Sequence, residues 1–328
     1  MTEGGEQIDA TLTKVSTPVS IRPLKGAELD KADQIFRSSF GTFLGLPDPS
    51  AFMSGAELVR ARWRSNPSAF LAAELDGEIV GSCYATNWGS LGFFGPLTIQ
   101  PGLWDRGLGQ KLLEQVIELF GTWQTRHIGL FTFPHSAKHI ALYQKFGFWP
   151  RHLTAVMRKR AEKVVGAAYT LLSEVPEPAR AEYLKACSGI CDSVCAGLDL
   201  GPEISTVLAH KFGDVVLLVN GSQLVAFGIC HCGPGSEAET GSCYVKFGLC
   251  RPEPQAQASF ARLLDACQSF AARRATAWLV AGVNTARHQA YRSMLEAGFK
   301  PEIYGIAMHR PNEPAYNREG IFLLDDWR

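Results

Sequence analysis

The sequence has 328 residues, with 32 lysines and arginines against 32 aspartates and glutamates, so its formal net charge is zero. This balance gives no indication of a nucleic-acid partner or of attraction to a membrane surface, since either usually comes with a basic excess. No apolar run reaches the roughly 20 residues of a membrane-spanning helix, and residues 1–18 have neither the basic start nor the apolar core of a secretory signal. We therefore expect a cytoplasmic protein with a flexible tail at 1–18.

A chain of this length predicts two domains of ordinary size. Its 9 cysteines include no Cys-x-x-Cys pair, which favours free thiols in a reducing compartment. Cys187, Cys191 and Cys195 recur at every fourth residue, so they would share one buried face of a helix. In Cys230-His231-Cys232, alternation along a strand would turn the imidazole away from both thiols, so no metal site is predicted.

The first 90 residues predict a strand, two helices and a hairpin. Leu29, Ala32, Ile35 and Phe36 have helical spacing, and Asp76-Gly77 suits a tight hairpin turn. The predicted elements are a strand at 19–23, helices at 27–40 and 55–65, a loop with aromatic side chains at 41–49, and strands at 69–75 and 78–87.

The most informative stretch runs from Leu91 to Phe120. A short strand at 97–99 ends before Pro101, a turn at 102–109 contains three glycines, and an amphipathic helix follows. Glycines let a backbone approach an anion closely, and the first turn of a helix offers free N–H groups and a positive dipole end. The stretch therefore predicts a phosphate site, with an ordinary strand-to-helix turn as the alternative. It fits neither the Walker A pattern nor the three-glycine dinucleotide fingerprint.

The rest of the chain predicts the end of one domain and then a second domain. A strand at 127–133, a helix at 135–147 and a strand at 153–157 complete the first half, which we divide from the second near residue 165. The second half predicts strands at 169–172, 215–220, 223–232, 244–250 and 277–283, and helices at 178–196, 203–211, 255–273 and 286–297.

Two landmarks recur in the two halves. Gly147-Phe148-Trp149-Pro150 is echoed by Gly298-Phe299-Lys300-Pro301, and Asp76-Gly77 is echoed by Asn220-Gly221. Both offsets are close to the length of one domain, which predicts a tandem duplication. The expected domains are therefore residues 19–165 and residues 166–328.

The hexapeptide Trp104-Asp105-Arg106-Gly107-Leu108-Gly109 resembles motif A of the GNAT superfamily, the acetyl-CoA-dependent N-acyltransferases, which reads Gln/Arg-x-x-Gly-x-Gly/Ala. Both glycines match, and Trp104 stands where Gln or Arg is usual. The run from Ala141 to Phe148, ALYQKFGF, resembles motif B of the same family. The resemblance covers residues 19–157 well and the second half weakly. It implies an α/β fold with two tandem GNAT-like domains, each a mixed, mostly antiparallel sheet flanked by helices.

The resemblance also implies acetyl-CoA as the acyl donor, without a metal. Main-chain N–H groups of the glycine turn would bind the pyrophosphate, the fourth strand would bind the pantetheine arm, and Tyr143 would act as general acid toward the leaving thiolate. Ser136 occupies the position of the motif's usual Asn. The predicted cofactor-binding residues are Leu97, Thr98, Ile99, Trp104, Asp105, Arg106, Gly107, Leu108, Gly109, Gln110 and Ser136.

The general base is not evident from the sequence. His135 follows a predicted strand and is the catalytic candidate beside Tyr143, while Asp48 and Asn87 lie in segments that could border the acceptor. His127 is expected in an exposed loop. A chain of water molecules is the alternative, because the amine need lose its proton only in part.

The second half differs from the first at the counterpart of the glycine turn. Residues 251–258, RPEPQAQA, contain no glycine, and their prolines lack N–H groups, so we expect no pyrophosphate site there. The function that fits best is N-acetyl transfer to a primary amine of a small molecule by a monomer or homodimer, without a nucleic-acid or membrane partner. The alternatives are a non-catalytic acyl-CoA-binding or regulatory module, a larger acyl donor, and a protein amine.

Overall fold

The computed structural model describes residues 19–328, and the tail predicted at 1–18 lies outside the described residues. The first half contains β1 (Ser20–Pro23), α1 (Leu29–Phe43), α2 (Leu58–Ser65), β2 (Phe70–Leu75), β3 (Glu78–Trp88), β4 (Leu91–Ile99), α3 (Leu108–Thr122), β5 (His127–Thr132), α4 (Ala137–Lys145) and β6 (Trp149–Arg160). The second half contains β7 (Thr170–Leu171), α5 (Ala179–Val194), α6 (Gly201–Ala209), β8 (Gly213–Asn220), β9 (Gln223–Cys232), β10 (Ser242–Cys250), α7 (Ala256–Arg273), β11 (Trp278–Asn284), α8 (His288–Glu296), β12 (Lys300–Arg310) and β13 (Leu323–Leu324).

The predicted helices and strands are all present, and their local signals explain why. Asp76 and Gly77 both have positive φ, 54° and 82°, as the tight turn between β2 and β3 requires. Helix α3 buries an apolar face that includes Leu112, Val116 and Phe120. Strands β4 and β6 are longer than predicted, and β12 and β13 were not predicted.

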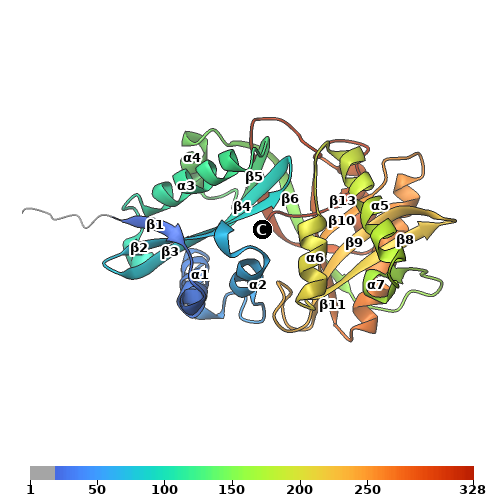
Figure 1. The fold of residues 1–328 in the computed structure, drawn as a ribbon. Coiled ribbons are helices and arrows are strands. Elements are labelled where there is room, and N and C mark those ends of the chain that lie inside the picture. Colours follow the sequence, from blue (N-terminus) through green and yellow to red (C-terminus); the bar gives the residue numbers. More distant parts are fainter. Residues whose placement is uncertain (1–18) are drawn as a thin grey trace, which may run out of the picture.

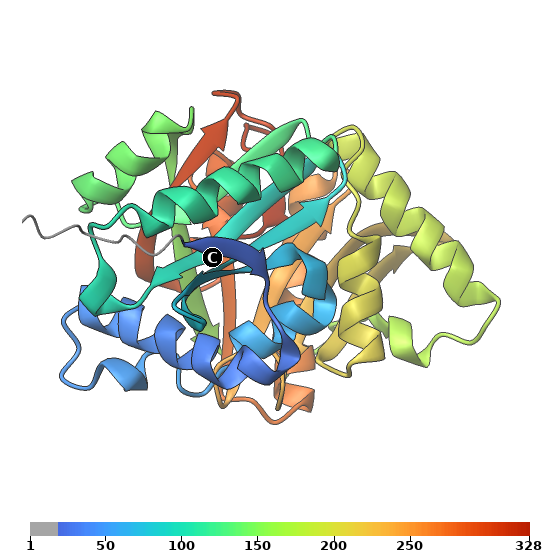
Figure 2. The same cartoon turned by 60° about the vertical axis from the view of Figure 1, so that its left-hand side comes forward.

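The strands form one mixed sheet across both halves. Its order is β1-β2-β3-β4-β5-β12-β6-β11-β10-β9-β8-β7, with β13 paired to β10. Figure 1 shows α3 and α4 on one side of the first half's strands and α1 and α2 on the other, and the turned view in Figure 2 keeps this layering. The predicted α/β class with a mixed, mostly antiparallel sheet and flanking helices is confirmed.

The two halves repeat the same strand arrangement. Only two pairs of neighbours in the sheet are parallel, β4 with β5 and β10 with β11, within residues 19–328. Leu91 pairs with His127 in the first half, and Ser242 pairs with Trp278 in the second. Each residue of the second pair lies 151 positions after its counterpart in the first pair. The same offset separates Gly147 from Gly298 in the sequence.

The halves exchange their last long strands. Strand β12, from the second half, pairs with β5 of the first, with Ala307 opposite Phe131. Strand β6, from the first half, pairs with β11 of the second, with Met157 opposite Ala281. The two exchanged strands also pair with each other, so the sheet is continuous through the junction. The division into domains at residues 165 and 166 stays a prediction.

The apolar cores also cross between the halves. One core cluster combines Trp88, Leu91 and Phe93 of the first half with α5, α6, β8 and β9 of the second. Trp88 is 1% exposed, and its Nε1 donates to Oε1 of Glu203 on α6 at 3.0 Å. Within residues 19–328, no helix is both long and apolar enough to cross a bilayer.

The cysteines occupy these cores. All 9 are free thiols in the structure. Cys187 and Cys191 share the buried face of α5, as the spacing predicts. The prediction is wrong for Cys195, which follows the end of the helix and is half-buried. Cys230 and Cys232 point together into the core under α7, whereas the His231 ring lies beside Phe212 and Tyr244. The alternation predicted for this tripeptide is therefore confirmed.

Candidate active site

A cavity of about 950 Å³ opens where the two halves meet. The first half lines it with α1, the outer part of β4, the turn before α3, the end of β5 and α4. The second half lines it with parts of β10, β11 and β12, the loop at 237–240, and residues 327 and 328. This volume is at the upper end of the range for small-molecule sites, so it can hold two reactants together.

The cavity follows a gap between the parallel strands β4 and β5. Their pairing extends only from Leu91 to Phe93. Beyond it the β3–β4 register shifts, so that Gly95 and Pro96 lie opposite the single residue Tyr84. This bulge turns β4 away from β5 and leaves its edge at 97–99 without a strand partner on the cavity side.

The glycine turn closes one end of this gap. Gly107 is the N-cap of α3 with φ 77°, a left-handed conformation that favours glycine. No side chain caps this helix end, and the N–H groups of Leu108 and Gly109 have no partner within the described chain. Trp104 fixes the turn, since its Nε1 donates to the main-chain oxygen of Ile99 at 2.6 Å. An uncapped helix N-terminus that opens into a cavity is a suitable site for phosphate.

The structure brings most of the predicted site residues to this cavity. The predicted residues that line it are Leu97, Thr98, Ile99, Trp104, Asp105, Gly107, Leu108, Gly109, Gln110, Ser136 and Tyr143. Arg106 and His135 are exposed and do not line it. Lys138, which the sequence did not single out, pairs with Asp105 at 2.5 Å beside the glycine turn.

Tyr143 lies in the wall of the cavity with its hydroxyl unpaired. The residue is 8% exposed, and its ring packs edge-on against Phe94 at 5.9 Å. Its hydroxyl makes no hydrogen bond within residues 19–328. Burial, with a smaller contribution from Cys83, raises the pKa of this hydroxyl well above its usual range. Tyr143 therefore stays protonated at neutral pH and is available as a hydrogen-bond donor.

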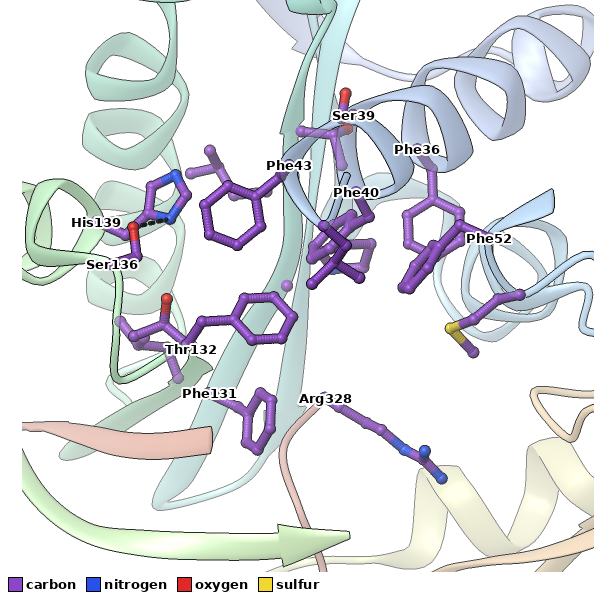
Figure 3. Close-up of a pocket in the computed structure, with 18 of the residues that line it drawn as sticks. Phe36, Ser39, Phe40, Phe43, Phe52, Phe131, Thr132, Ser136, His139 and Arg328 are labelled. Carbon is purple, nitrogen blue, oxygen red and sulfur yellow. Dashed lines mark hydrogen bonds between the residues drawn. The ribbon is translucent and has the colours of Figure 1, made fainter. Parts of the chain in front are cut away.

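A histidine that the sequence did not single out lies close to Tyr143. His139 is one helical turn before Tyr143 on α4. This i, i+4 spacing places the two side chains on one face of the helix, and it is the sequence signal that could have identified His139. The Nδ1 atom of His139 lies 2.9 Å from Oγ of Ser136, as the dashed line in Figure 3 shows. Burial lowers the pKa of His139, with the charge of Lys138 adding to the effect. The ring of His135 instead stacks on that of Phe43, with ring centroids 5.7 Å apart.

Phenylalanine rings cover the side of the cavity formed by α1, its following loop and the end of β5. Phe40 and Phe52 are stacked with centroids 5.2 Å apart, and Phe43 lies 5.3 Å from Phe133. Figure 3 shows the rings of Phe40, Phe43 and Phe52 turned toward the interior of the cavity. We call this set the aromatic wall: Phe36, Phe40, Phe43, Phe52, Phe131 and Phe133.

Four buried charges connect the two halves next to the cavity, and one of them, Glu237, lines it. Arg62 on α2 pairs with Glu237 at 3.0 Å, Glu237 also pairs with Lys246, and Lys246 pairs with Glu203 at 3.1 Å. All four are at most 5% exposed, and their formal charges cancel. Burial opposes the charge on Glu237, but Arg62 and Lys246 outweigh it and lower the pKa of this carboxyl. We call these four residues the buried charge network.

The second half has a gap between β10 and β11 that corresponds to the gap between β4 and β5, and residues 321–328 pass through it. Strands β10 and β11 separate after Val245, as β4 and β5 do after Phe93. Strand β13 then pairs with β10 at Gly248 and Leu249, and the N–H of Asp325 donates to the oxygen of Gly282 at 3.0 Å. The open gap of the first half is therefore closed here by the chain itself.

The remaining candidates for a general base lie elsewhere. Asp48 is exposed and accepts hydrogen bonds from its neighbour Ser50. Asn87 borders a separate small pocket and accepts the N–H of Gly89. The expectation that His127 lies in an exposed loop is wrong, because it begins β5, is 7% exposed and contacts His309 on β12.

Residues 33–148 match the acetyltransferase (GNAT) family. No curated protein matches the chain at a significant level. Among solved structures, a proposed acetyltransferase from Pyrococcus horikoshii is 14% identical, with a TM-score of 0.65 over 97% of both chains. A GCN5-related N-acetyltransferase from Sphaerobacter thermophilus is 14% identical, with a TM-score of 0.60 over 89% of this chain and 95% of that one.

A tandem GNAT protein from the clavulanic acid biosynthesis pathway is also 14% identical, with a TM-score of 0.54 over 89% of this chain and 98% of that one. At these identities the likeness concerns the fold alone. The match to the family model covers the glycine turn and Tyr143, and the structural likeness covers both halves. Residues 33–148 therefore match the GNAT family, and the two halves together have the fold of tandem GNAT structures.

Proposed function

We propose that the protein transfers an acetyl group from acetyl-CoA directly to a primary amine of a small molecule, with the chemistry in the first half. The proposal rests on one observation: two groups suited to different parts of CoA face the same cavity. The uncapped N-terminus of α3 at Gly107 and the unpaired hydroxyl of Tyr143 both face it, along one edge of β4. The first suits the pyrophosphate of CoA, and the second suits its sulfur.

The residues of the chain would divide the work as follows. The N–H groups of Leu108 and Gly109 hold the pyrophosphate, and the free edge of β4 at 97–99 holds the pantetheine arm in extended form. The amine attacks the thioester carbonyl, the carbon–sulfur bond breaks, and Tyr143 donates its proton to the sulfur. The amine loses its proton to water, and Tyr143 recovers one from water. The products are an N-acetyl amine and free CoA.

The acceptor is proposed to be small because the second half covers the cavity. Glu237, Tyr244 and Ile303 line it from the side opposite the glycine turn, so an acceptor enters between the two halves. Within β4 and its flanks, from Phe93 to Gln100, no side chain is a carboxylate that could serve as base. Because this strand offers no carboxylate, we propose that water takes the proton of the amine.

The test is release of thiol from acetyl-CoA by the full chain with a panel of primary amines. Tyr143→Phe should lower kcat by about 100-fold or more, the range found for general acids, without weakening CoA binding measured by calorimetry. Tyr183→Phe is the matched control, because Tyr183 is on α5 and packs in a different core. Its kcat should equal that of the wild type.

Three results would overturn parts of the proposal. CoA binding without turnover of any amine would indicate a non-catalytic acyl-CoA-binding module. Faster turnover with a longer acyl-CoA would replace acetyl as the donor. An unchanged kcat in the Tyr143→Phe variant would remove Tyr143 as the general acid.

A further inference from the structure

Arg328 places a cation inside the cavity, from a part of the chain far from the glycine turn in sequence. Residues 321–328 pass through the gap of the second half and reach the cavity at Trp327 and Arg328. Figure 1 shows residue 328, marked C, between the two halves. Arg62 fixes its backbone, because Nη2 of Arg62 donates to the main-chain oxygen of Arg328 and Nη1 donates to that of Gly95.

The guanidinium of Arg328 is held in position but retains free donors. Its Nε lies 3.2 Å from Oδ2 of Asp326, and its central carbon lies 4.2 Å from the centre of the Tyr244 ring. The side chain is 25% exposed. Within residues 19–328, neither Nη atom makes a hydrogen bond to a carboxylate or to a main-chain oxygen, which leaves the planar end of the group available for two parallel bonds to a carboxylate.

This cation lies too far along β4 to serve the pyrophosphate. Its backbone is tied beside Gly95, whereas the glycine turn packs on Ile99 through Trp104. Four residues of extended strand separate these points, a distance of about 13 Å. In Figure 3 the side chain of Arg328 lies at the end of the cavity away from Ser136 and His139. An anion bound by Arg328 would therefore belong to the acceptor.

The surroundings of Arg328 also restrict the rest of that molecule. The aromatic wall faces the same cavity, and its stacked pair Phe40 and Phe52 provides a flat apolar surface. Of the carboxylates that the second half adds to the cavity, Glu237 pairs with Arg62 and Glu302 pairs with Arg158 at 2.8 Å. The third, Glu239, is exposed and accepts the N–H of Gly55 at 3.1 Å. The guanidinium of Arg328 and a large apolar surface thus face the same cavity.

We propose that the acceptor amine is an amino carboxylate with an aromatic or large apolar side group, and that Arg328 binds its carboxylate. The inference rests on the proposed acetyl transfer for the role of the amine. The binding of the carboxylate rests on the geometry of Arg328 alone, so the two can be tested separately.

The experiment compares amines that differ only in the carboxylate: L-phenylalanine with phenethylamine, L-tryptophan with tryptamine, and L-leucine with isoamylamine. The wild type should favour the carboxylate member of a pair in kcat/KM by at least 10-fold. Arg328→Gln should lower kcat/KM for that member by about 10- to 100-fold, as expected for loss of a charged hydrogen-bond pair, and change it less than twofold for the partner. Arg328→Lys should give an intermediate loss, because a lysine cannot form the two parallel bonds.

Arg292→Gln is the matched control, since Arg292 is an exposed arginine on α8 that pairs with Glu296. Binding of L-tryptophan and tryptamine is measured by calorimetry in parallel, with CoA present, and thermal melts confirm that each variant is folded. Turnover without a preference for the carboxylate would overturn this inference and leave acetyl transfer intact. Carboxylate-dependent binding that Arg328→Gln abolishes, without any turnover, would support the inference and overturn acetyl transfer. Equal binding of the two ligands by wild type and Arg328→Gln would overturn it regardless of turnover.

Discussion

The contact between His127 and His309 should make the exchanged strand sensitive to acid. His127 starts β5 and His309 lies on β12, and their ring nitrogens Nε2 and Nδ1 are 2.9 Å apart. Burial lowers the pKa of His127 to about 4, with Arg151 adding to the effect. Burial also lowers the pKa of His309 to about 3, with His127 as the next cause. Both rings are therefore neutral in the folded protein at neutral pH.

The sign of the effect follows from proton binding. Below the ordinary histidine pKa of about 6.5, the unfolded chain takes up protons that the folded chain does not, so the free energy of unfolding falls as the pH falls. At pH 5 each histidine would reduce this free energy by about 2 kcal/mol, or about 4 kcal/mol together. An unfolding entropy of about 0.65 kcal/mol/K for a chain of this size converts this to a fall of about 6 °C in the melting temperature.

The assay is thermal unfolding followed by circular dichroism between pH 7.5 and pH 5. His309→Gln removes one ring of this pair, so its melting temperature should fall by about 3 °C less than that of the wild type over this interval. His152→Gln, at an exposed position on β6, is the control and should keep the wild-type slope. Equal slopes for wild type and His309→Gln would refute the reasoning, because the buried pair would then contribute nothing to acid sensitivity.

Three further predictions concern substitutions at single positions. Gly107→Ala places a β-carbon at φ 77°, so it should cost about 1 kcal/mol in unfolding and raise KM for acetyl-CoA more than KM for the acceptor, as melting curves and initial rates would show. Gly282→Ala would place a β-carbon 2.3 Å from Asp326 and so displace residues 321–328. It should lower kcat/KM for the acceptor and leave CoA binding unchanged. The control Gly121→Ala, which has open space around its added β-carbon, should change neither quantity. Glu237→Gln leaves an excess positive charge in the buried charge network and should reduce the free energy of unfolding by about 3–5 kcal/mol, measured by urea titration.

The helices, the strands and the glycine turn were predictable because their signals are local. The positive φ of Gly107 and the hairpin turn at Asp76 and Gly77 depend on residues next to one another in sequence. Tyr143 could be placed for the same reason, since motif B keeps it on a helix shortly after β5. Ser136, which was predicted from the same resemblance, also lines the cavity.

The strand exchange and the far side of the cavity were not predictable in this way. A strand such as β12 carries no signal for which neighbour it will join, and its partner β5 is more than 150 residues earlier. His127 looked like a polar residue at a strand end because its partner His309 lies 182 residues away. Arg328 had no motif at all, and its place in the cavity depends on how residues 321–328 thread through the second half.

The exchanged strands also determine when the first half can be complete during synthesis. Strand β5 is made by residue 132, but its neighbour β12 is residues 300–310, so the ribosome must deliver more than 160 further residues before this edge is covered. Until then β5 presents an open edge of unpaired N–H and C=O groups. A single cut between β6 and β7, at residues 161–169, would leave two fragments. Each fragment would contain a strand, β6 or β12, that pairs with strands of the other fragment. Such fragments would stay associated, and the cavity would survive the cut.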